Sequence, residues 1–221
     1  MAIQIEMGRR ERVRVFLYGA PGSMKTTAAA AFPKPVFLQD GDALGADFTG
    51  KPRVRINTVG DVREFLALGK ELAKFETVVL DDFSTWVKRM VEAKGKTGDP
   101  RRAYKDVNDE LLPEVRKILA LGKNVVFTGH HQTEKEIYRS GDKSLERAWV
   151  HPTLPDALEI YVLSLVDVVG YCYNNGACHA LVVERADARL RVTAKRRVGI
   201  ECPDCVAMGP KGEGLAKALL G

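Results

Sequence analysis

Few features of this 221-residue sequence tie it to a membrane or to an export pathway. It has no run of 18 apolar residues, the length that a membrane-spanning helix needs. Its first residues, Met1 to Glu6, lack the apolar core of a signal peptide. These absences exclude a helical membrane protein, and we expect a soluble protein of the cytoplasm.

Internal repeats and low-complexity segments are also lacking, which excludes a solenoid or a long disordered tail. Hydrophobic residues make up 45% of the chain, enough for one substantial core. The sequence therefore predicts a single domain over residues 1–221, with a core from about 12 to 200 and short extensions at both ends.

Cysteine is scarce, with four residues in the whole chain. Cys202 and Cys205 have the two-residue spacing of a zinc knuckle, and Cys172 and Cys178 flank a turn that could bring a second pair near. Reduced cysteines are also common core residues, and an intracellular chain need not pair them. The spacing permits a structural zinc ion but favours four reduced cysteines.

No strong excess of charge is present either. The 34 Lys and Arg residues outnumber the 29 Asp and Glu residues by five, and the pI is near 9.0. A charge of +5 permits a nucleic-acid partner without requiring one.

What the sequence does contain is a glycine-bearing segment between a predicted strand, Val13 to Tyr18, and a predicted helix, Thr26 to Phe32. It follows the pattern G-x-x-x-x-G-K-[ST] except at one position. Backbone N–H groups of such a loop surround phosphates, while its Lys and the helix N-terminus supply positive charge and its hydroxyl binds Mg²⁺. The residues that we expect to hold ATP are Gly19, Ala20, Pro21, Gly22, Ser23, Met24, Lys25, Thr26 and Thr27.

The exception is Met24, which stands where the last glycine of the pattern is expected. If residue 24 begins the helix, its φ is negative and its side chain can point away from the nucleotide. On this hypothesis the substitution leaves nucleotide binding intact.

A second motif is the apolar run from Thr77 that ends in Asp81 and Asp82, typical of a Walker B strand. Ligands collect at the carboxyl ends of buried parallel strands, so Asp81 is the candidate to hold Mg²⁺ together with Thr26. Asp82 has two interpretations of equal weight. It is either a second acid that polarises the attacking water or the N-terminal cap of the next helix.

Two further strands end in polar residues that would face the nucleotide. Pro35 to Gln39 leads to Asp40 and Asp42, either of which could activate water, and Asn124 to Gly129 leads to His130, which could contact the γ-phosphate. Alternatively, the acids form a turn around a glycine and His130 is an ordinary polar strand end.

Strands alternate with helical patterns through residue 130, which favours an α/β fold with a mainly parallel sheet and helices on both faces. Thr58 and Asp61 resemble a capping box. A helical stripe runs through Tyr104, Val107, Leu111, Val115 and Ile118.

The C-terminal third is richer in strand patterns. Glu134 to Arg139 and Ser144 to His151 read as a hairpin, and a short helix is predicted from Thr153 to Leu165. The last three predicted strands form an antiparallel set at one edge of the sheet: Asp167 to Tyr173, Cys178 to Arg185, and Arg189 to Lys195.

In the order of these motifs the chain resembles short phage-encoded RecA/RadA-like P-loop ATPases, the group linked to single-strand annealing and recombination, with an AAA-like nucleotide-binding domain. The resemblance runs from about Val13 to Arg197. It implies that Asp42 is the catalytic base, that His130 senses the γ-phosphate, and that Lys195 and Arg197 reach the nucleotide of a neighbouring subunit. It also implies a homo-oligomeric ring or filament and a phage protein acting in its host cell. Met24 and the short side chain of Asp42 depart from the family pattern.

Two basic segments are candidates for contact with single-stranded DNA, and the resemblance strengthens both. One is a predicted loop after the Walker B strand that also carries Tyr104, and the other is the predicted hairpin with Trp149. A solvated charged loop is the alternative for each. The candidate residues are Lys94, Lys96, Arg101, Arg102, Lys105, Arg139, Lys143 and Arg147.

The sequence thus predicts a RecA-type ATPase in which Lys25, Mg²⁺ and the loop amides hold the phosphates while an acid orients water. One alternative is a P-loop kinase of a small molecule, with the segment at Arg101 and Arg102 as its lid. Another is a slow, nucleotide-switched assembly module. Stimulation of hydrolysis by DNA separates the three.

Overall fold

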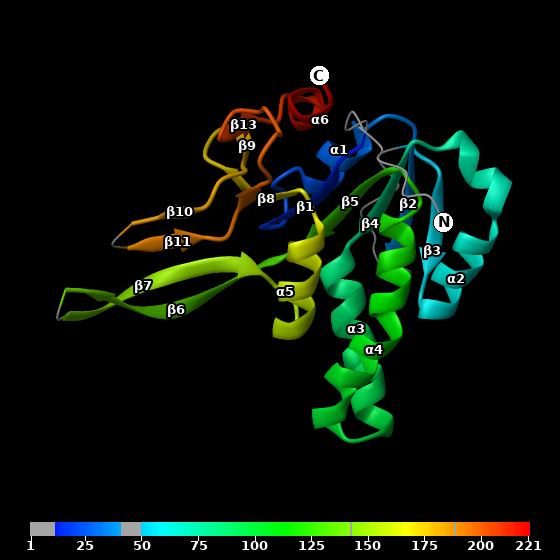
Figure 1. Ribbon diagram of the computed structural model, residues 1–221, viewed down its shortest axis with the longest axis horizontal. Coiled ribbons are helices and arrows are strands. Elements are labelled where there is room, and N and C mark those ends of the chain that lie inside the picture. The colour runs from blue at the N-terminus through cyan, green and yellow to red at the C-terminus, as the bar shows by residue number, and fades with distance from the viewer. Residues whose placement is uncertain (1–11, 41–49, 142, 188) are drawn as a thin grey trace, which may run out of the picture.

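The computed structural model describes residues 12–40, 50–141, 143–187 and 189–221. Within them the chain forms a nine-stranded central sheet, helices on both of its faces, and a separate four-stranded sheet (Figure 1). The predicted α/β fold with a mainly parallel sheet is therefore confirmed.

Six strands of the central sheet are parallel and lie in the order β3-β2-β4-β5-β1-β8. Most of their residues are buried, which explains why these segments are continuous apolar runs in the sequence. Their bounds are β1 Arg14–Gly19, β2 Pro35–Asp40, β3 Arg53–Ile56, β4 Thr77–Asp81, β5 Asn124–Gly129 and β8 Val168–Asn174.

The strand β5 lies between β1 and β4, so the phosphate loop and the Walker B strand are not direct neighbours. Register aligns Leu17 of β1 with Thr128 of β5, and Leu80 of β4 with Phe127. The carboxyl ends of the three strands therefore meet at one edge of the sheet.

Three antiparallel strands extend this sheet beyond β8: β9 (Cys178–Leu181), β12 (Lys195–Arg196) and β13 (Cys205–Ala207). Of the predicted antiparallel set, the pairing of β8 with β9 is confirmed, although β8 also pairs in parallel with β1. The third predicted strand is wrong, because its residues Leu190 to Val192 join the separate four-stranded sheet. The helix α5 (Asp156–Leu165) precedes β8 and supplies the crossover that a parallel neighbour needs. The helix begins three residues later than predicted.

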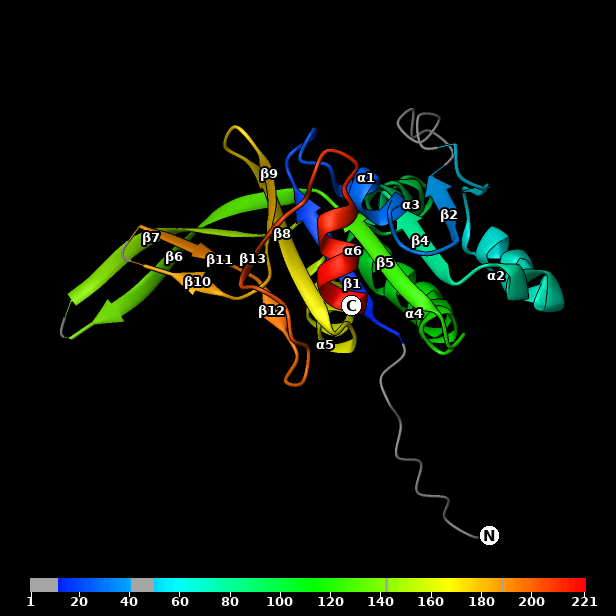
Figure 2. The ribbon, with the colours of Figure 1, turned by 90° about the horizontal axis from the view of Figure 1, so that it is seen from above.

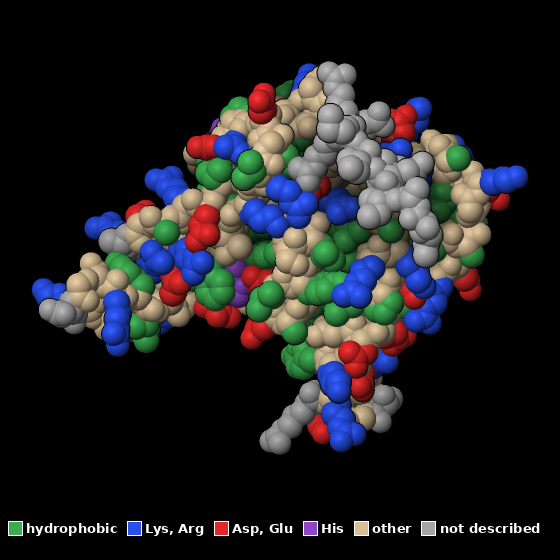
Figure 3. All heavy atoms as spheres, viewed as in Figure 1, with side chains coloured by type: hydrophobic (Ala, Val, Ile, Leu, Met, Phe, Trp, Pro, Cys, Tyr) green, Lys and Arg blue, Asp and Glu red, His purple; other side chains and the backbone are tan. Residues whose placement is uncertain are grey.

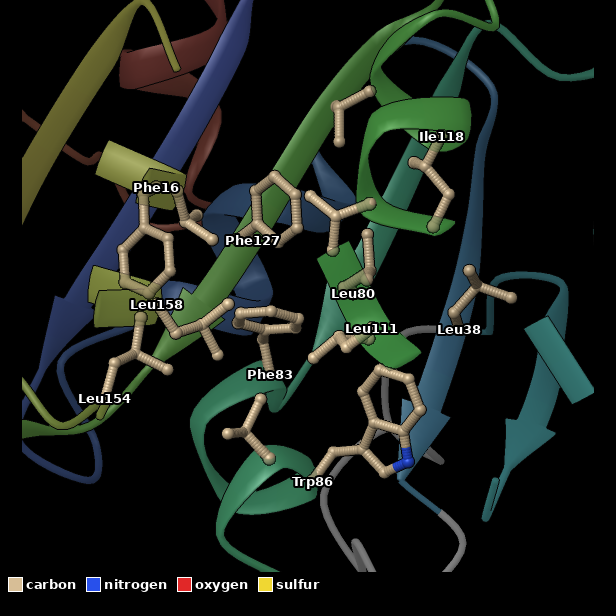
Figure 4. Close-up of a cluster of buried hydrophobic side chains, with 14 of the residues drawn as sticks. Phe16, Leu38, Leu80, Phe83, Trp86, Leu111, Ile118, Phe127, Leu154 and Leu158 are labelled. Carbon is tan, nitrogen blue, oxygen red and sulfur yellow. The ribbon is translucent and has the colours of Figure 1, made fainter. Parts of the chain in front are cut away.

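Helices cover the sheet unequally. Helices α1 (Lys25–Ala30) and α6 (Glu213–Leu220) pack on one face, and the other face is covered by α2 (Val59–Ala67), a 3₁₀ helix (Gly69–Lys74), α3 (Phe83–Thr97), α4 (Pro100–Leu119) and α5. On that second face Phe16, Phe83 and Phe127 point toward one another from β1, α3 and β5 (Figure 4). The predicted capping box of Thr58 and Asp61 at the start of α2 is confirmed.

The basic segment after the Walker B strand is helical, which corrects the predicted loop. Helices α3 and α4 form an antiparallel hairpin joined at Gly98 and Asp99. Pro100 is the first residue of α4, where its fixed φ favours a helix and its missing N–H costs nothing. Tyr104 does not belong to the buried stripe, because it is 52% exposed whereas Val107 and Leu111 are buried.

The four-stranded sheet has the order β10-β11-β7-β6 and extends away from the central sheet in both Figure 1 and Figure 2. Its longest part is the predicted hairpin, β6 (His131–Ser140) with β7 (Lys143–Pro152), which is confirmed. The strand β11 (Leu190–Val192) joins β7 in parallel, and β10 (Arg185–Ala186) pairs with β11. Each helix in the described ranges is too short or too polar to cross a bilayer.

Candidate active site

The loop between β1 and α1 holds two glycines for different reasons. A Cβ on Gly19 would lie 2.1 Å from the carbonyl oxygen of Cys172, so the close approach of β8 leaves room for no side chain. Gly22 has open space around it but a φ of +78°, which glycine adopts at little cost. Ala20 and Ser23 close the loop, since the hydroxyl of Ser23 donates to the Ala20 carbonyl at 2.8 Å. Pro21 lies exposed in the same loop.

Met24 has a φ of +63° and a ψ of +20°, the left-handed conformation. This corrects the hypothesis that residue 24 begins the helix with a negative φ. The turn from Gly22 into α1 needs left-handed backbone immediately before Lys25, which is why the family pattern has glycine there. Met24 therefore occupies a strained position that its side chain does not favour.

Lys25 is the first residue of α1 and is only 8% exposed. Its ammonium group donates to the carbonyl oxygens of Gly19 at 3.0 Å and Ala20 at 2.9 Å. Both acceptors are neutral, and burial lowers the pKa of this amine below its ordinary value. A buried cation held only by carbonyl oxygens gains strongly from an anionic ligand such as a phosphate.

Thr26 and Asp81 meet at the same edge of the sheet. The Thr26 hydroxyl donates to Asp81 Oδ1 at 2.8 Å, and Thr128 of the intervening strand β5 donates to the same oxygen at 2.6 Å. Burial raises the pKa of Asp81 above its ordinary value, against the opposing effect of these two hydrogen bonds. Thr27 follows in the first turn of α1.

These two side chains fit a magnesium ion. Mg²⁺ prefers oxygen ligands and is usually held by one or two carboxylates together with nucleotide phosphates and water. Among the described residues no three His, Cys, Asp or Glu side chains gather as metal ligands. A site made of Thr26, Asp81 and nucleotide oxygens is consistent with that finding, since it needs a single carboxylate.

Asp82 is the N-terminal cap of helix α3, which was one of the two roles predicted for it. Its Oδ1 accepts from the backbone N–H of Thr85 at 3.0 Å and from the Ser84 hydroxyl at 2.7 Å. Its other oxygen lies 3.3 Å from His130 Nε2. The backbone N–H of His130 donates to Ser84 Oγ at 2.9 Å, so the ends of β4 and β5 are joined by one polar network.

Asp40 is buried at the end of β2 and forms an ion pair with Arg89 of α3. A carboxylate in this pair is less available as a base than a solvent-facing one. Asp42, the base that the resemblance implies, lies outside the described residues.

Lys195 and Arg197 lie away from the phosphate loop of their own chain. Lys195 aligns with Val169 near the start of β8, whereas Gly19 aligns with Cys172 further along that strand. The ammonium of Lys195 donates to the Leu163 carbonyl, and Arg197 pairs with Asp167 at 3.0 Å. Within one chain both residues therefore bind the end of α5 and the segment after it, not the nucleotide site.

The basic candidates for DNA contact fall into two groups. Lys94 pairs with Glu110 at 2.8 Å, and Arg147 pairs with Glu136 at 2.6 Å, so both are engaged within the fold. Arg101 lies in the first turn of α4. The exposed members are Lys96, Arg102, Lys105, Arg139 and Lys143.

The four cysteines are all free. Cys172 is buried beside the phosphate loop, and burial raises the pKa of its thiol to about 12. Cys205 lies 3.3 Å from the Tyr173 hydroxyl. This arrangement gives no support to a zinc site built from Cys172, Cys178, Cys202 and Cys205 in the part of the chain described.

Sequence reasoning missed Thr128 and Ser84. Thr128 is a polar residue in an otherwise apolar strand, and that interruption was the available signal. Ser84 gave no signal, because its role depends on the contact between β5 and the first turn of α3.

The sequence and the structure of the chain were compared with known families, relatives and solved structures. A model of the AAA domain family matches residues 11–198. The SPbeta prophage-derived uncharacterized protein YorG of Bacillus subtilis (strain 168) is 25% identical over 196 residues, which cover 81% of this chain and 56% of that protein. The chain thus spans little more than half the length of this relative. The crystal structure of the KaiC-like protein PH0186 from Pyrococcus horikoshii OT3 shares 15% identity at a TM-score of 0.49, covering 90% of this chain and 87% of that chain.

Proposed function

The chain belongs to the AAA domain family, and from that membership we propose that it binds ATP with Mg²⁺ at the loop from Gly19 to Thr27 and hydrolyses it. The observation that carries the proposal is Lys25, a buried ammonium whose two acceptors are neutral carbonyls. Phosphate oxygens would supply charged acceptors in place of these neutral ones.

Different residues of the chain would bind the phosphates, hold the metal ion and orient the water. Lys25 and the loop N–H groups bind the phosphates, and Thr26 and Asp81 would hold Mg²⁺, which neutralises phosphate charge when bound. Asp82 contacts His130 Nε2 at 3.3 Å at the carboxyl end of β5, where the imidazole would bind the γ-phosphate. The acid that orients water is then Asp42 or Asp82, of which Asp82 lies within the described residues.

Binding of a fluorescent ATP analogue and release of phosphate, each with and without Mg²⁺, test the proposal. Lys25→Ala should weaken binding at least about tenfold, because a buried charge–phosphate contact exceeds 1.4 kcal/mol. Lys70→Ala removes an equal charge from the exposed surface of the 3₁₀ helix and should change neither quantity. Equal ATP affinity of the parent protein and Lys25→Ala would refute the nucleotide site.

We further propose that the ATPase acts on single-stranded DNA in phage recombination, annealing or replication. Two observations support this: the relative YorG is described as prophage-derived, and exposed Lys and Arg side chains stand on both projecting parts of the molecule (Figure 3). Phosphate release at low salt, with and without a single-stranded oligonucleotide, is the test. Stimulation is expected, and an unchanged rate with measurable ATP turnover would refute the DNA part alone.

Self-association is the third part of the proposal, with Lys195 and Arg197 acting on the nucleotide of the next subunit. Their distance from the loop of their own chain supports a role in trans. In a ring or filament Arg197→Ala and Lys25→Ala should each be inactive alone, and their mixture should recover part of the activity. No recovery, with both variants assembled, would leave Lys195 and Arg197 with a structural role only, in contact with the end of α5 and with Asp167.

One observation favours the kinase alternative. A cavity of about 630 Å³ opens beside Ser84, close to the Asp82 network, and an acceptor molecule would need such a space. Transfer of labelled γ-phosphate to a small molecule, in place of its release, would decide for the kinase. Tight ATP binding without turnover would instead favour the slow assembly switch.

A further inference from the structure

The cavity of about 630 Å³ lies outside the phosphate loop, where helices α3 and α4 meet the start of β6 and the segment before α5. Its volume lies within the range of ligand pockets, about 300–1,000 Å³. Part of its wall is apolar, from Val91, Leu154 and Pro155. A ligand of moderate size with an apolar face would fit it.

Tyr104 gives the cavity an aromatic wall. The side chain is 52% exposed, unlike Val107 and Leu111 further along α4, and it lines the cavity instead of packing in the core. An aromatic ring at an open cavity offers a stacking surface for another flat ring.

Asn108 stands one turn further along α4 in the same wall. Its Oδ1 atom is buried and has no hydrogen-bond partner within the described residues. A buried acceptor without a partner costs stability, and a rotation of the Asn108 amide toward the cavity would let a ligand N–H bind Oδ1 and remove this cost. The cavity therefore combines a stacking surface with one acceptor at its side.

Positive charge lies on both sides of the cavity, while the lining itself holds Lys88 together with the acidic Glu92 and Asp156. Lys88 of α3 is part of the lining, its ammonium 4.0 Å from Glu92 and largely exposed. Arg102 and Lys105 are exposed within a turn of Tyr104, and Arg139 and Lys143 are exposed at the far end of the β6–β7 hairpin. The α3–α4 hairpin and the β6–β7 hairpin project from the molecule in Figure 1, and Lys and Arg side chains lie on both projecting parts in Figure 3. The cavity lies where α3 and α4 meet the start of β6.

We propose that this cavity receives one unstacked base of single-stranded DNA. The base would stack on Tyr104, donate an exocyclic amino group to Asn108 Oδ1, and leave its phosphate near Lys88. This inference rests on the DNA-binding part of the proposed function and adds to it a site and a base preference. Cytosine and adenine carry an exocyclic amino group, whereas thymine has a carbonyl oxygen in place of that of cytosine.

The cavity also adjoins the polar network of Asp82, Ser84 and His130 at the ends of β4 and β5. Ser84 lines the cavity, donates to Asp82 and accepts from the N–H of His130. A base that displaces or tightens Ser84 would alter the position of His130 at the end of β5. The same contact gives a physical route by which DNA could change the rate of hydrolysis.

The test is fluorescence anisotropy with labelled 15-mers of dC, of dT and of abasic sugar-phosphate, at one fixed salt concentration. The parent protein should bind dC about fivefold more tightly than dT, as one added hydrogen bond predicts, and the abasic strand least. Asn108→Ala should bind dC and dT equally. Tyr104→Ala should lose about tenfold in affinity for dC and almost nothing for the abasic strand, while Tyr104→Phe keeps parental affinity.

Ile160→Ala, which removes an exposed side chain from the outer surface of α5, is the control and should match the parent protein. Equal binding of the dC and abasic strands by the parent would overturn the base site while leaving DNA binding in place. No binding of any strand, with ATP still bound, would overturn both the base site and the DNA part of the proposed function but not the ATP site. Phosphorylation of a small molecule that depends on Tyr104 would assign the cavity to the kinase alternative instead.

Discussion

The Thr26 hydroxyl donates to Asp81 Oδ1 at 2.8 Å, across 55 positions of sequence. This hydrogen bond joins the first turn of α1 to the last residue of β4, although β5 separates β4 from β1 in the sheet. Thr128 of β5 binds the same oxygen and closes the gap. One carboxylate therefore holds three elements at the edge where the phosphate loop lies.

Asp81→Asn should stabilise the protein at neutral pH and strongly lower the proposed Mg²⁺-dependent hydrolysis. Burial raises the pKa of Asp81, so the folded chain holds this proton more tightly than the unfolded chain does. The free energy of unfolding then falls as the pH rises from the unfolded pKa, about 3.9, through the raised folded pKa. Asparagine avoids that loss, and its Oδ1 can still accept from Thr26 and Thr128.

Thermal melts of Asp81→Asn and the parent protein over a pH series check this. The variant should melt a few degrees higher at pH 7, and the difference should vanish below about pH 4. Turnover should fall by about 10²-fold or more, because the metal ligand is lost. A lower melting temperature at pH 7 would contradict the role of burial.

Met24→Gly should raise the free energy of unfolding by about 0.5–1 kcal/mol. The left-handed backbone at residue 24 costs a residue with a Cβ more than it costs glycine, and the greater freedom of glycine in the unfolded chain offsets part of the gain. Met24→Ala keeps the Cβ and serves as the control. Urea denaturation of both variants is the measurement, and an equal gain from alanine would point to the methionine side chain instead of the backbone.

Gly212→Ala should displace or destabilise helix α1, which carries Lys25 and Thr26. A Cβ at residue 212 would lie 2.7 Å from the backbone of Thr27 and Ala28, atoms that cannot rotate away. Gly176→Ala is matched to it, since Gly176 also has a positive φ but nothing within 4 Å. We expect Gly212→Ala to lose about 1–3 kcal/mol more stability than Gly176→Ala, and to weaken ATP binding, which Gly176→Ala should not.

Asp82→Asn separates the two interpretations of this residue. Asparagine caps a helix as well as aspartate does, so stability should stay near that of the parent, whereas Asp82→Ala should lose about 1 kcal/mol. Loss of the charge that faces His130 should lower kcat by about tenfold or more with little change in KM. Steady-state kinetics and urea denaturation measure both effects. An unchanged kcat would leave the cap as the whole role of Asp82.

Local sequence was sufficient for the parts of the site that lie on buried parallel strands. The apolar runs before Gly19, Asp81 and His130 are each completely or almost completely buried, so their ends could be located by counting. Because a hydroxyl and a carboxylate can bind the same Mg²⁺ ion, Thr26 and Asp81 were expected to lie together, and in the structure they form a hydrogen bond.

What could not be predicted depends on contacts that no local pattern encodes. The segment after the Walker B strand was predicted as a loop, but packing of α3 against α4 keeps it helical on both sides of Gly98 and Asp99. The conformation of Met24 follows from the path of the loop between β1 and α1, not from its neighbours in sequence. The helix α6 was missed because its place is set by the contact of Gly212 with α1.

The position of β1 in the sheet also governs when the site can assemble as the chain is synthesised. Val15 pairs with Val126 on one side and Val168 on the other, so both partners of the first strand are made more than a hundred residues later. A nascent chain that ends before β8 leaves one edge of β1 open and lacks the Cys172 carbonyl that packs on Gly19. Such non-local pairing slows folding, and the phosphate loop acquires its shape only after most of the chain has left the ribosome.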